Sequence, residues 1–361
     1  MTRYDCWFAA LQGISRAHRR AFLAEYDPEA LYRMSDREAE ELTCFSSREL
    51  DVLRQSKTSD LCGKTERAMD ENRMRFCSIR DPEYPQRLRY IPDPPLGLFV
   101  RGSLPPEDLP AVAVAGARMC SEYGRSVATQ IGRRLAEQGI AVISGLALGI
   151  DSASHAGALQ GHGYTCAVLG SGADICYPRS SRTLYENMIQ TGGGVVSEYP
   201  PGSPPERWHF PERNRIISGL ADTLVVVEAK ARSGSLITAD QALEQGRDVF
   251  AVPGRLGDAL SEGCFRLVEQ GAKIVYSLEQ LPQTFNLMPQ KPMKSVPKIK
   301  PVLEKEESLV YSCLDLYPKN IRLISEHTGL QRKKLLEILN LLKEKGLIRE
   351  DIRNYYTRLL T

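Results

Sequence analysis

Two arginines and an asparagine follow a proline in the stretch FPERNRIISG, from Phe210 to Gly219. Proline suits the first turn of a helix, and the free backbone N–H groups of that turn bind anions. Arg213, Asn214 and Arg215 beside such a turn indicate a phosphate site. The alternative is that the two arginines, which lie on different helix faces, pair with surface acids. This segment alone leaves both interpretations open.

Four other segments carry residue types that phosphate oxygens prefer, each where an apolar run gives way to a helix start. They are AGARMCSEYG with Arg118, SGLALGID with Ser144 and Gly145, GSGADICYPR with Arg179, and ARSGSLITAD with Gly234, Ser235 and Thr238. Glycines let backbone N–H groups approach an oxygen closely, and helix N-termini add a favourable dipole. Turn geometry alone explains any one of these segments. Together with FPERNR they predict a single phosphate-binding site.

A conventional enzyme is the main rival to a binding site. Asp151 and His155 lie four residues apart, where they could act as an acid/base pair. We favour the interpretation that Asp151 caps a helix and that His155 packs behind the loop. Glu198 is either catalytic or orders neighbouring arginines, and we favour ordering. The chain lacks H-E-x-x-H, G-x-S-x-G and Walker-type G-x-x-x-x-G-K-[ST] segments. We therefore expect no catalytic residue, no metal and no cofactor.

The elements that position these residues follow from the alternation of short apolar runs with helical segments between residues 111 and 276. The runs 111–116, 140–145, 165–170, 194–198, 223–229 and 248–254 are predicted strands. Such alternation is typical of an α/β domain with a mostly parallel, doubly wound, Rossmann-like sheet. The helix-start segments then meet at the carboxyl edge of the sheet, where ligands bind in such folds.

The regions on either side of this alternating segment differ from it in composition and pattern. Residues 1–66 carry repeated capping signals and predict a small helical domain of the SAM- or HhH-like kind, and residues 67–287 form the extended Rossmann-like domain. Residues 288–304 are rich in Pro and Lys and predict a linker. Residues 305–361 predict a winged-helix domain, with helices at 307–316, 321–328 and 331–345 before a hairpin.

Charge and cysteine content narrow the function classes. From Gln290 onward the chain has 15 Lys plus Arg against 9 Asp plus Glu, which suits a polyanion partner for the tail but equally a solvated linker. The winged helix could therefore contact nucleic acid, contact protein or be purely structural. The 9 cysteines form no C-x-x-C motif, and the apolar runs are too short for a membrane helix. A cytoplasmic protein without a membrane partner is expected.

In order along the chain, the motifs AGAR-x-x-S-x-YG, SGLALGID-x-x-SH, VLGSGADICYP, SEYPPG, FPERNRIISGL, VEA-x-x-x-SGSLITA and GRDVFAVPG resemble the DNA-processing protein A family, also called DprA or Smf. The resemblance is close from about Tyr84 to Tyr276 and loose in the flanking parts. The combination of FPERNR with SGSLITA is highly specific.

The resemblance implies a protein that binds single-stranded DNA without cutting it. It also implies a homodimer through the Rossmann-like domain and a role in loading a RecA-type recombinase during natural transformation. Carried onto this chain, it implies that Arg118, Arg179, Arg213 and Arg215 surround phosphates, that Ser144, Gly145, Gly234, Ser235 and Thr238 add backbone or hydroxyl contacts, and that Asn214 adds a polar one. The aromatic candidates for stacking on bases are Tyr177, Tyr199, Trp208 and Phe210.

Three positions depart from the family pattern, and two other functions stay open. Ala117 stands where Ser is usual and Ser181 where Asn is common, which could weaken polar contacts, and Cys264 replaces Asn in a predicted turn. One alternative is a nucleotide phosphoribohydrolase of the lysine-decarboxylase-like kind, but the chain lacks the P-G-G-x-G-T-x-x-E of those enzymes. The other is a central domain that senses a mononucleotide, with a regulatory tail.

Overall fold

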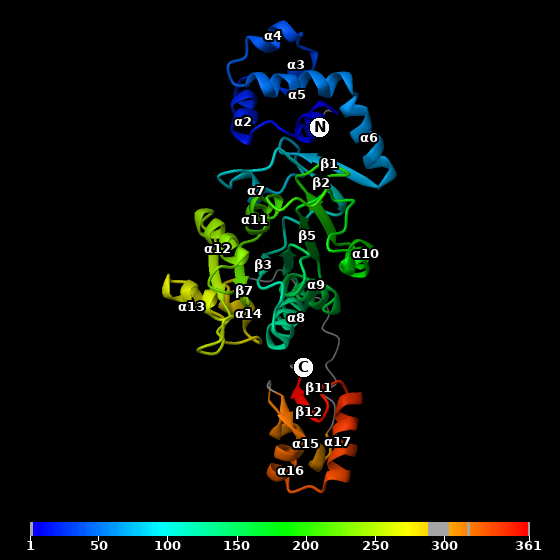
Figure 1. Cartoon of the computed structure of the whole chain (residues 1–361), viewed down its shortest axis with the longest axis vertical. Helices are drawn as coiled ribbons and strands as arrows, with labels where there is room; N and C mark the ends of the chain where they lie inside the picture. Colours follow the sequence, from blue (N-terminus) through cyan, green and yellow to red (C-terminus); the bar gives the residue numbers. More distant parts are fainter. Residues whose placement is uncertain (1–2, 288–302, 316–317, 360–361) are drawn as a thin grey trace.

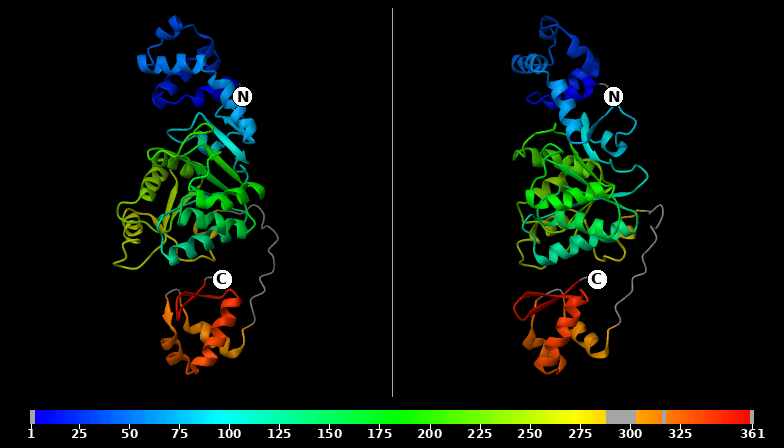
Figure 2. Two further views of the ribbon diagram at one scale, coloured as in Figure 1. Left: turned by 45° about the vertical axis from the view of Figure 1, so that its right-hand side comes forward. Right: turned by 90° about the vertical axis from the view of Figure 1, so that its right-hand side faces the viewer.

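The computed structural model describes residues 3–287, 303–315 and 318–359. Figure 1 shows three successive parts: helices at the N-terminus, a central sheet flanked by helices, and a smaller C-terminal module. The N-terminal helices and the C-terminal module lie at opposite ends of the central domain in every view (Figure 2). Residues 288–302, which include most of the predicted linker, lie outside the described residues.

Helices α1 to α6 surround an aromatic core. Trp7, Phe8, Phe22 and Phe45 are buried there, and the Trp7 indole donates a hydrogen bond to Ser56 Oγ at 3.1 Å. Helices this short are marginal in isolation, so burial of these rings stabilises them. The helices are α1 (Arg3–Ala10), α2 (Arg16–Glu25), α3 (Pro28–Arg33), α4 (Asp36–Glu40), α5 (Ser47–Thr58) and α6 (Leu61–Glu71).

Capping side chains begin these helices where the sequence indicated. Asp27 accepts from the backbone of α3, and the pairs Ser35 with Glu38 and Ser46 with Glu49 form capping boxes at α4 and α5. The predicted domain end at residue 66 falls inside α6, which continues to Glu71 and leads directly into the first strand.

A nine-stranded sheet with strand order β1-β2-β6-β5-β4-β3-β7-β8-β9 forms the central domain. Strands β3 to β9 run parallel, whereas β1 and β2 add antiparallel neighbours at one edge. The strands are β1 (Met74–Ser78), β2 (Gly97–Gly102), β3 (Ala111–Ala115), β4 (Ala141–Ser144), β5 (Thr165–Leu169), β6 (Gly194–Ser197), β7 (Thr223–Val226), β8 (Asp248–Ala251) and β9 (Lys273–Ile274). All six predicted strands are confirmed as β3 to β8, and the doubly wound α/β fold is confirmed with them.

Helices cover both faces of the sheet, and alternation along the strands explains why. In β3, Ala111 and Ala113 face one apolar cluster with α11, α12 and α13, whereas Val112 and Val114 face another with α8, α9 and α14. The helices are α7 (Gln86–Arg89), α8 (Glu122–Glu137), α9 (Ile150–Gln160), the 3-10 helix η1 (Arg179–Ser181), α10 (Arg182–Gln190), α11 (His209–Gly219), α12 (Gly234–Glu244), α13 (Glu262–Glu269) and α14 (Leu281–Thr284). The chain order reverses between β3 and β7, which opens a crevice at their carboxyl ends.

The C-terminal module contains the helices and hairpin that the sequence predicted. Its helices are α15 (Lys305–Cys313), α16 (Ile321–Thr328) and α17 (Arg332–Glu344), and its antiparallel sheet has the order β10-β12-β11, with β10 (Lys319–Asn320), β11 (Ile348–Ile352) and β12 (Tyr355–Arg358). The module has its own apolar core, which includes Val310, Leu335 and Leu339. Arg349 of this module forms an ion pair with Glu122 of the central domain at 2.7 Å.

Candidate nucleic-acid interface

A groove of about 700 Å³ lies at the carboxyl ends of β3 and β7, where the strand order reverses. The loop after β3, the first turn of α11 and the first turn of α12 form its walls. Among the described residues that line it, five are cationic and one is an acid. The cations are Arg118, Arg207, Arg213, Lys230 and Arg232, and the acid is Asp151.

Arg213 supplies a fixed charge in the floor of this groove. Its side chain is buried, and Nη1 donates to the carbonyl oxygen of Gly145 at 3.0 Å and to that of Val168. Burial lowers the pKa of Arg213 to about 10, so the guanidinium stays charged at neutral pH. A Cβ at Gly145 would lie 2.7 Å from Arg213 Nη2, so glycine leaves room for this side chain.

Arg118 is exposed and lines the same groove as the buried Arg213. Its guanidinium lies 5.1 Å from the ring centroid of Phe210, and that of Arg213 lies 5.8 Å from the same ring. Gly149, with a φ of +81°, lets α9 begin against the backbone of Arg118, because a Cβ there would lie 2.3 Å from the Ala117 carbonyl oxygen. The aromatic ring therefore holds two cations on one side of the groove.

The first turn of α12 contributes polar groups. Ser233 caps the helix, accepting from the Ser235 backbone N–H at 3.4 Å, and Ser235 and Thr238 are buried against the groove. Asn214 Nδ2 donates to the Gly234 carbonyl at 3.5 Å and so joins α11 to α12. These four predicted contacts, at Asn214, Gly234, Ser235 and Thr238, all line the groove together with Arg118 and Arg213.

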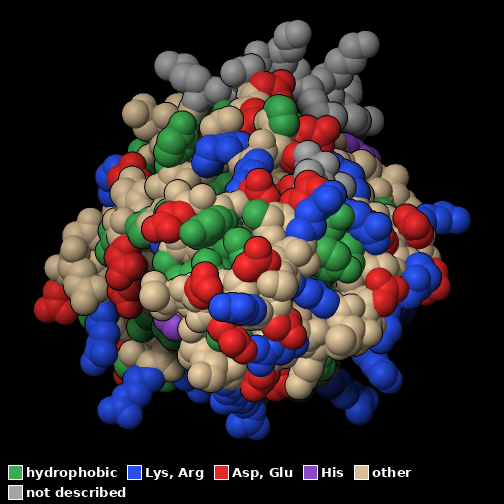
Figure 3. Space-filling model, turned by 90° about the horizontal axis from the view of Figure 1, so that it is seen from above, with side chains coloured by type: hydrophobic (Ala, Val, Ile, Leu, Met, Phe, Trp, Pro, Cys, Tyr) green, Lys and Arg blue, Asp and Glu red, His purple; other side chains and the backbone are tan. Residues whose placement is uncertain are grey.

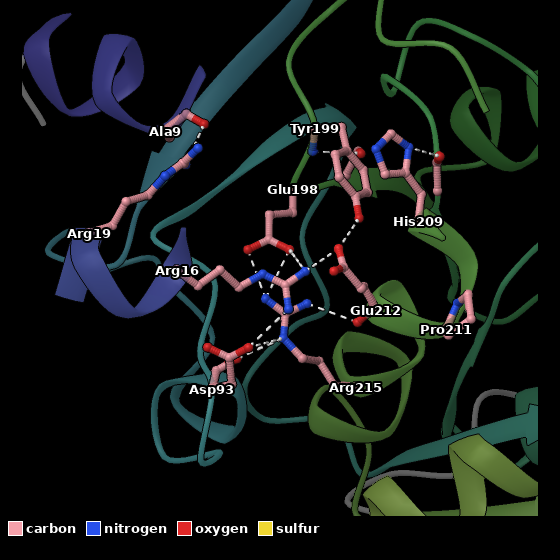
Figure 4. Close-up of polar contacts among 12 residues, drawn as sticks. Ala9, Arg16, Arg19, Asp93, Glu198, Tyr199, His209, Pro211, Glu212 and Arg215 are labelled. Carbon is pink, nitrogen blue, oxygen red and sulfur yellow. Dashed lines mark hydrogen bonds and ion pairs between the residues drawn. The ribbon is translucent and has the colours of Figure 1, made fainter. Parts of the chain in front are cut away.

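Arg215 lies elsewhere, although it belongs to the same motif. Only 5% of its surface is exposed, and its guanidinium is bonded to Glu198 at 2.8 Å and to Asp93 at 3.1 Å (Figure 4). Burial lowers the pKa of Arg215 and the two carboxylates raise it by more, so its pKa lies above the ordinary value. The arrangement differs from the expected phosphate contact and follows the interpretation that Glu198 orders an arginine.

The remaining predicted contacts lie outside the lining of the groove. Ser144 is fully buried, and its hydroxyl donates to the Val114 carbonyl at 2.6 Å, so it joins β4 to β3. Gly145 lines a smaller adjoining pocket together with Arg118, Tyr177 and Phe210. Arg179 is exposed and follows Pro178, which lines that pocket, but it does not line the pocket itself.

The aromatic candidates separate by exposure. Tyr177 and Phe210 line the groove, and Trp208 is 58% exposed beside it without lining it. Tyr199 is buried, stacks on the His209 ring with 3.7 Å between centroids, and donates to Glu212 at 3.1 Å. Tyr199 is therefore a packed residue and not a stacking surface.

The Asp151 and His155 pair does not form an acid/base site. His155 is fully buried, its ring lies 2.7 Å from Thr165 Oγ1, and burial lowers its pKa to about 3. Burial raises the pKa of Asp151 to about 6. Its carboxylate accepts from the Gly145 N–H at 3.1 Å and so fixes the loop before α9. The prediction that Asp151 caps the helix is therefore wrong, since no side chain caps α9.

The three departures from the family pattern have small structural consequences. Ala117 lines the groove without a hydroxyl, and Ser181 Oγ lies 3.3 Å from Ser152 Oγ. Cys264 is buried in α13, with Sγ 3.6 Å from the Val227 carbonyl oxygen. It lies in a helix that packs on the sheet, so the prediction that this position belongs to a turn is wrong.

Sequence reasoning missed three cations of the groove, namely Arg207, Lys230 and Arg232. All three are exposed, and none of them forms an ion pair within the described part of the chain. Lys230 and Arg232 lie between β7 and α12, immediately before SGSLITA. The rule that ligands bind after the carboxyl ends of parallel strands could have found them.

Two classes of site find no support among residues 3–287, 303–315 and 318–359. No group of three or more His, Cys, Asp or Glu side chains there could hold a metal ion. No helix in those ranges has the length and apolar character needed to span a membrane.

Comparisons with known proteins agree with the geometry. Residues 75–286 match the family model for DNA recombination-mediator protein A. The chain is 48% identical over 200 residues to the DNA processing protein DprA of Streptococcus pneumoniae, which covers 55% of this chain and 70% of that protein.

Two solved structures are similar as well. The crystal structure of DprA from S. pneumoniae has a TM-score of 0.68 at 35% identity, covering 80% of this chain and 99% of that one. The structure of DNA processing protein A from Helicobacter pylori, described for its single-stranded DNA binding mode, has a TM-score of 0.53 at 27% identity, covering 59% of this chain and 96% of that one. With more than half of its residues matched by the family model, the chain belongs to the DNA recombination-mediator protein A family.

Proposed function

We propose that the chain binds single-stranded DNA, without sequence preference and without cutting it, in the groove at the carboxyl ends of β3 and β7. The observation that carries this proposal is the charge imbalance of the groove, where five cations face one buried carboxylate. Four of these cations are exposed and form no ion pair within the described residues. Phosphates along a flexible strand are the natural partners of such a surface.

The surface at the N-terminal end, where cations have acidic partners, differs from the groove and supports the interpretation that the groove binds phosphates. Viewed from the N-terminal end, Lys and Arg side chains alternate with Asp and Glu (Figure 3). At this end Arg54 pairs with Asp36, Glu40 and Asp51. Cations that already have acidic partners gain little from a phosphate, whereas unpaired cations release counterions when they bind one.

Arg213 is the group best placed to hold a phosphate in the floor of the groove. Nη1 is occupied by two backbone carbonyls, and Nη2 has no hydrogen-bond partner among the described residues. A guanidinium that is already immobilised loses little conformational entropy when it binds an oxyanion. Tyr177 and Phe210, which line the same groove, would offer surfaces for adjacent bases.

The wider role proposed is that of a recombination mediator that acts as a homodimer and helps to load a RecA-type recombinase onto the bound strand. Membership of the DNA recombination-mediator family supports this role. The proposal includes the three described parts as separate domains, with the C-terminal module as a winged helix. Sedimentation of the purified chain, alone and with a RecA-type recombinase, tests both associations.

Titration of a fluorescent oligo-dT tests DNA binding directly. Arg118→Ala should weaken binding at least about tenfold at low salt and reduce the slope of log affinity against log salt by roughly 0.7. Arg48→Ala is the matched control, because Arg48 is an exposed arginine of α5 that does not line the groove. If Arg118→Ala binds oligo-dT as the wild type does and the protein hydrolyses a mononucleotide, the phosphoribohydrolase alternative would be favoured over DNA binding.

A further inference from the structure

The face of α11 that carries Arg215 is clamped to the N-terminal helical domain by a network of charges. Arg16, from α2, contacts Glu212 at 2.5 Å and Asp93 at 3.0 Å, and Arg215 contacts Asp93 and Glu198. Figure 4 shows the two arginines approaching the same carboxylates from α2 and α11. Arg16 Nη2 also lies 3.8 Å from Glu198. Arg20, also from α2, contacts Asp93 at 2.7 Å, so three cations share three carboxylates across a domain boundary.

The network ends one residue away from the buried arginine of the groove. Glu212 and Arg213 are consecutive residues in the first turns of α11, and Glu212 does not line the groove. The space around the Arg213 guanidinium is tight, since a single added Cβ at Gly145 would lie 2.7 Å from it. A small shift at the start of α11 therefore changes where Arg213 Nη2 points.

We propose that Arg16 is a positioning residue for DNA binding. By holding Glu212, the N-terminal helical domain fixes the start of α11 and keeps Arg213 oriented toward the phosphate. The inference rests on the proposed function of the groove, but it concerns residues that do not line the groove. Arg16 and Glu212 line a separate cavity of about 330 Å³ with Asp93 and Arg215.

The direction in which DNA affinity changes when Glu212 is removed separates a positioning role from long-range electrostatics. Removing the positive charge of Arg16 would weaken DNA binding by either route. Removing the negative charge of Glu212 would strengthen binding if only long-range charge mattered, because the protein becomes more positive. Positioning predicts that Glu212→Ala weakens binding as well.

The test uses the full chain and fluorescent oligo-dT, with Arg16→Ala, Glu212→Ala and the double variant. Each single change should raise the dissociation constant by about threefold to tenfold, and the double variant should be no weaker than the weaker single one, because both changes break the same contact. The salt slope should fall by less than the roughly 0.7 expected for Arg118→Ala, since Arg213 is misplaced but keeps its charge in the groove. Arg16→Lys should restore part of the affinity.

Arg54→Ala is the control, because Arg54 is also an ion-paired arginine of the N-terminal helices but its partners belong to the same helices. It should bind as the wild type does. Wild-type binding by Arg16→Ala, or tighter binding by Glu212→Ala, would overturn the inference. If Arg16→Ala unfolds the N-terminal helices, Glu212→Ala decides alone, since that side chain is 37% exposed. Loss of the Arg118→Ala effect would instead remove the proposed function itself.

Discussion

Arg213 and Arg215 are two residues apart on one helix and have opposite surroundings. Both side chains are buried, but Arg213 faces a groove with a surplus of cations, whereas Arg215 is enclosed by the carboxylates of Glu198 and Asp93. The number of arginines in a motif therefore does not identify a phosphate site. The partners already present around each guanidinium identify it.

The largest difference between the two arginines should appear in stability. Arg215→Ala removes the buried cation that Glu198 and Asp93 share and leaves them only the more exposed Arg16 and Arg20. We therefore expect a loss of about 2–4 kcal/mol in the free energy of unfolding. Arg213→Ala should cost less stability, because its guanidinium forms no ion pair among the described residues, and should cost more DNA affinity. Urea unfolding and oligo-dT titration of both variants give the two numbers. Equal losses of stability and of affinity in both variants would contradict the comparison.

Gly145→Ala should disturb the surroundings of Arg213 without disturbing those of Arg215. The new Cβ would lie 2.7 Å from both Arg213 Nη2 and Asp151 Oδ2, so the guanidinium has to move. We expect about 1–3 kcal/mol of destabilisation from the overpacking. DNA affinity should fall severalfold, while the Arg215 contacts persist. Gly192→Ala is a useful reference for adding a methyl group, because a Cβ there meets no atom within 4 Å, although its φ of +88° adds backbone strain.

The smallest expected effect is a dependence on pH that arises in the groove. Asp151 has its pKa raised to about 6 by burial, so lowering the pH from 7.5 to 5.5 protonates it and leaves the groove more positive. DNA affinity should rise about twofold to fivefold over this range. Asp151→Asn should bind more tightly at pH 7.5 and lose this part of the pH dependence. An unchanged pH profile in Asp151→Asn would show that Asp151 is not the titrating group.

The same carboxyl group contributes to stability with a definite sign. Its folded-state pKa of about 6 lies above the ordinary value of 3.8, so the folded chain binds the proton more tightly than the unfolded chain does. The stabilising contribution is therefore present below pH 3.8 and is lost as the pH rises through 6. Comparing urea unfolding of the wild type and Asp151→Asn between pH 5 and 7.5 isolates it.

The sequence was sufficient for the parts of the fold that depend on local pattern. The apolar runs predicted β3 to β8, and the capping boxes at Ser35 and Ser46 predicted helix starts, because both signals lie within a few residues of the element. Strands β1 and β2 were missed, since prolines interrupt the segment between them and their pairing is set by distant strand β6.

The sequence could likewise place only those site residues whose positions follow from local pattern. Residues after strand ends, such as Arg118 and Ser235, reach the groove because parallel strands share one carboxyl edge. The direction of Arg215 depends on Asp93 and Glu198, which are remote in sequence, and the role of Ser144 depends on its neighbour in β3. Pattern within FPERNR could not reveal either tertiary contact.

The most direct test is a structure of the chain bound to oligo-dT, measuring the distance from each arginine to the nearest phosphate oxygen. The account predicts a phosphate within hydrogen-bond distance of Arg213 Nη2 and of Arg118, while Arg215 keeps its contacts with Asp93 and Glu198. DNA bound outside the groove, or Arg215 released from its carboxylates to hold a phosphate, would contradict it.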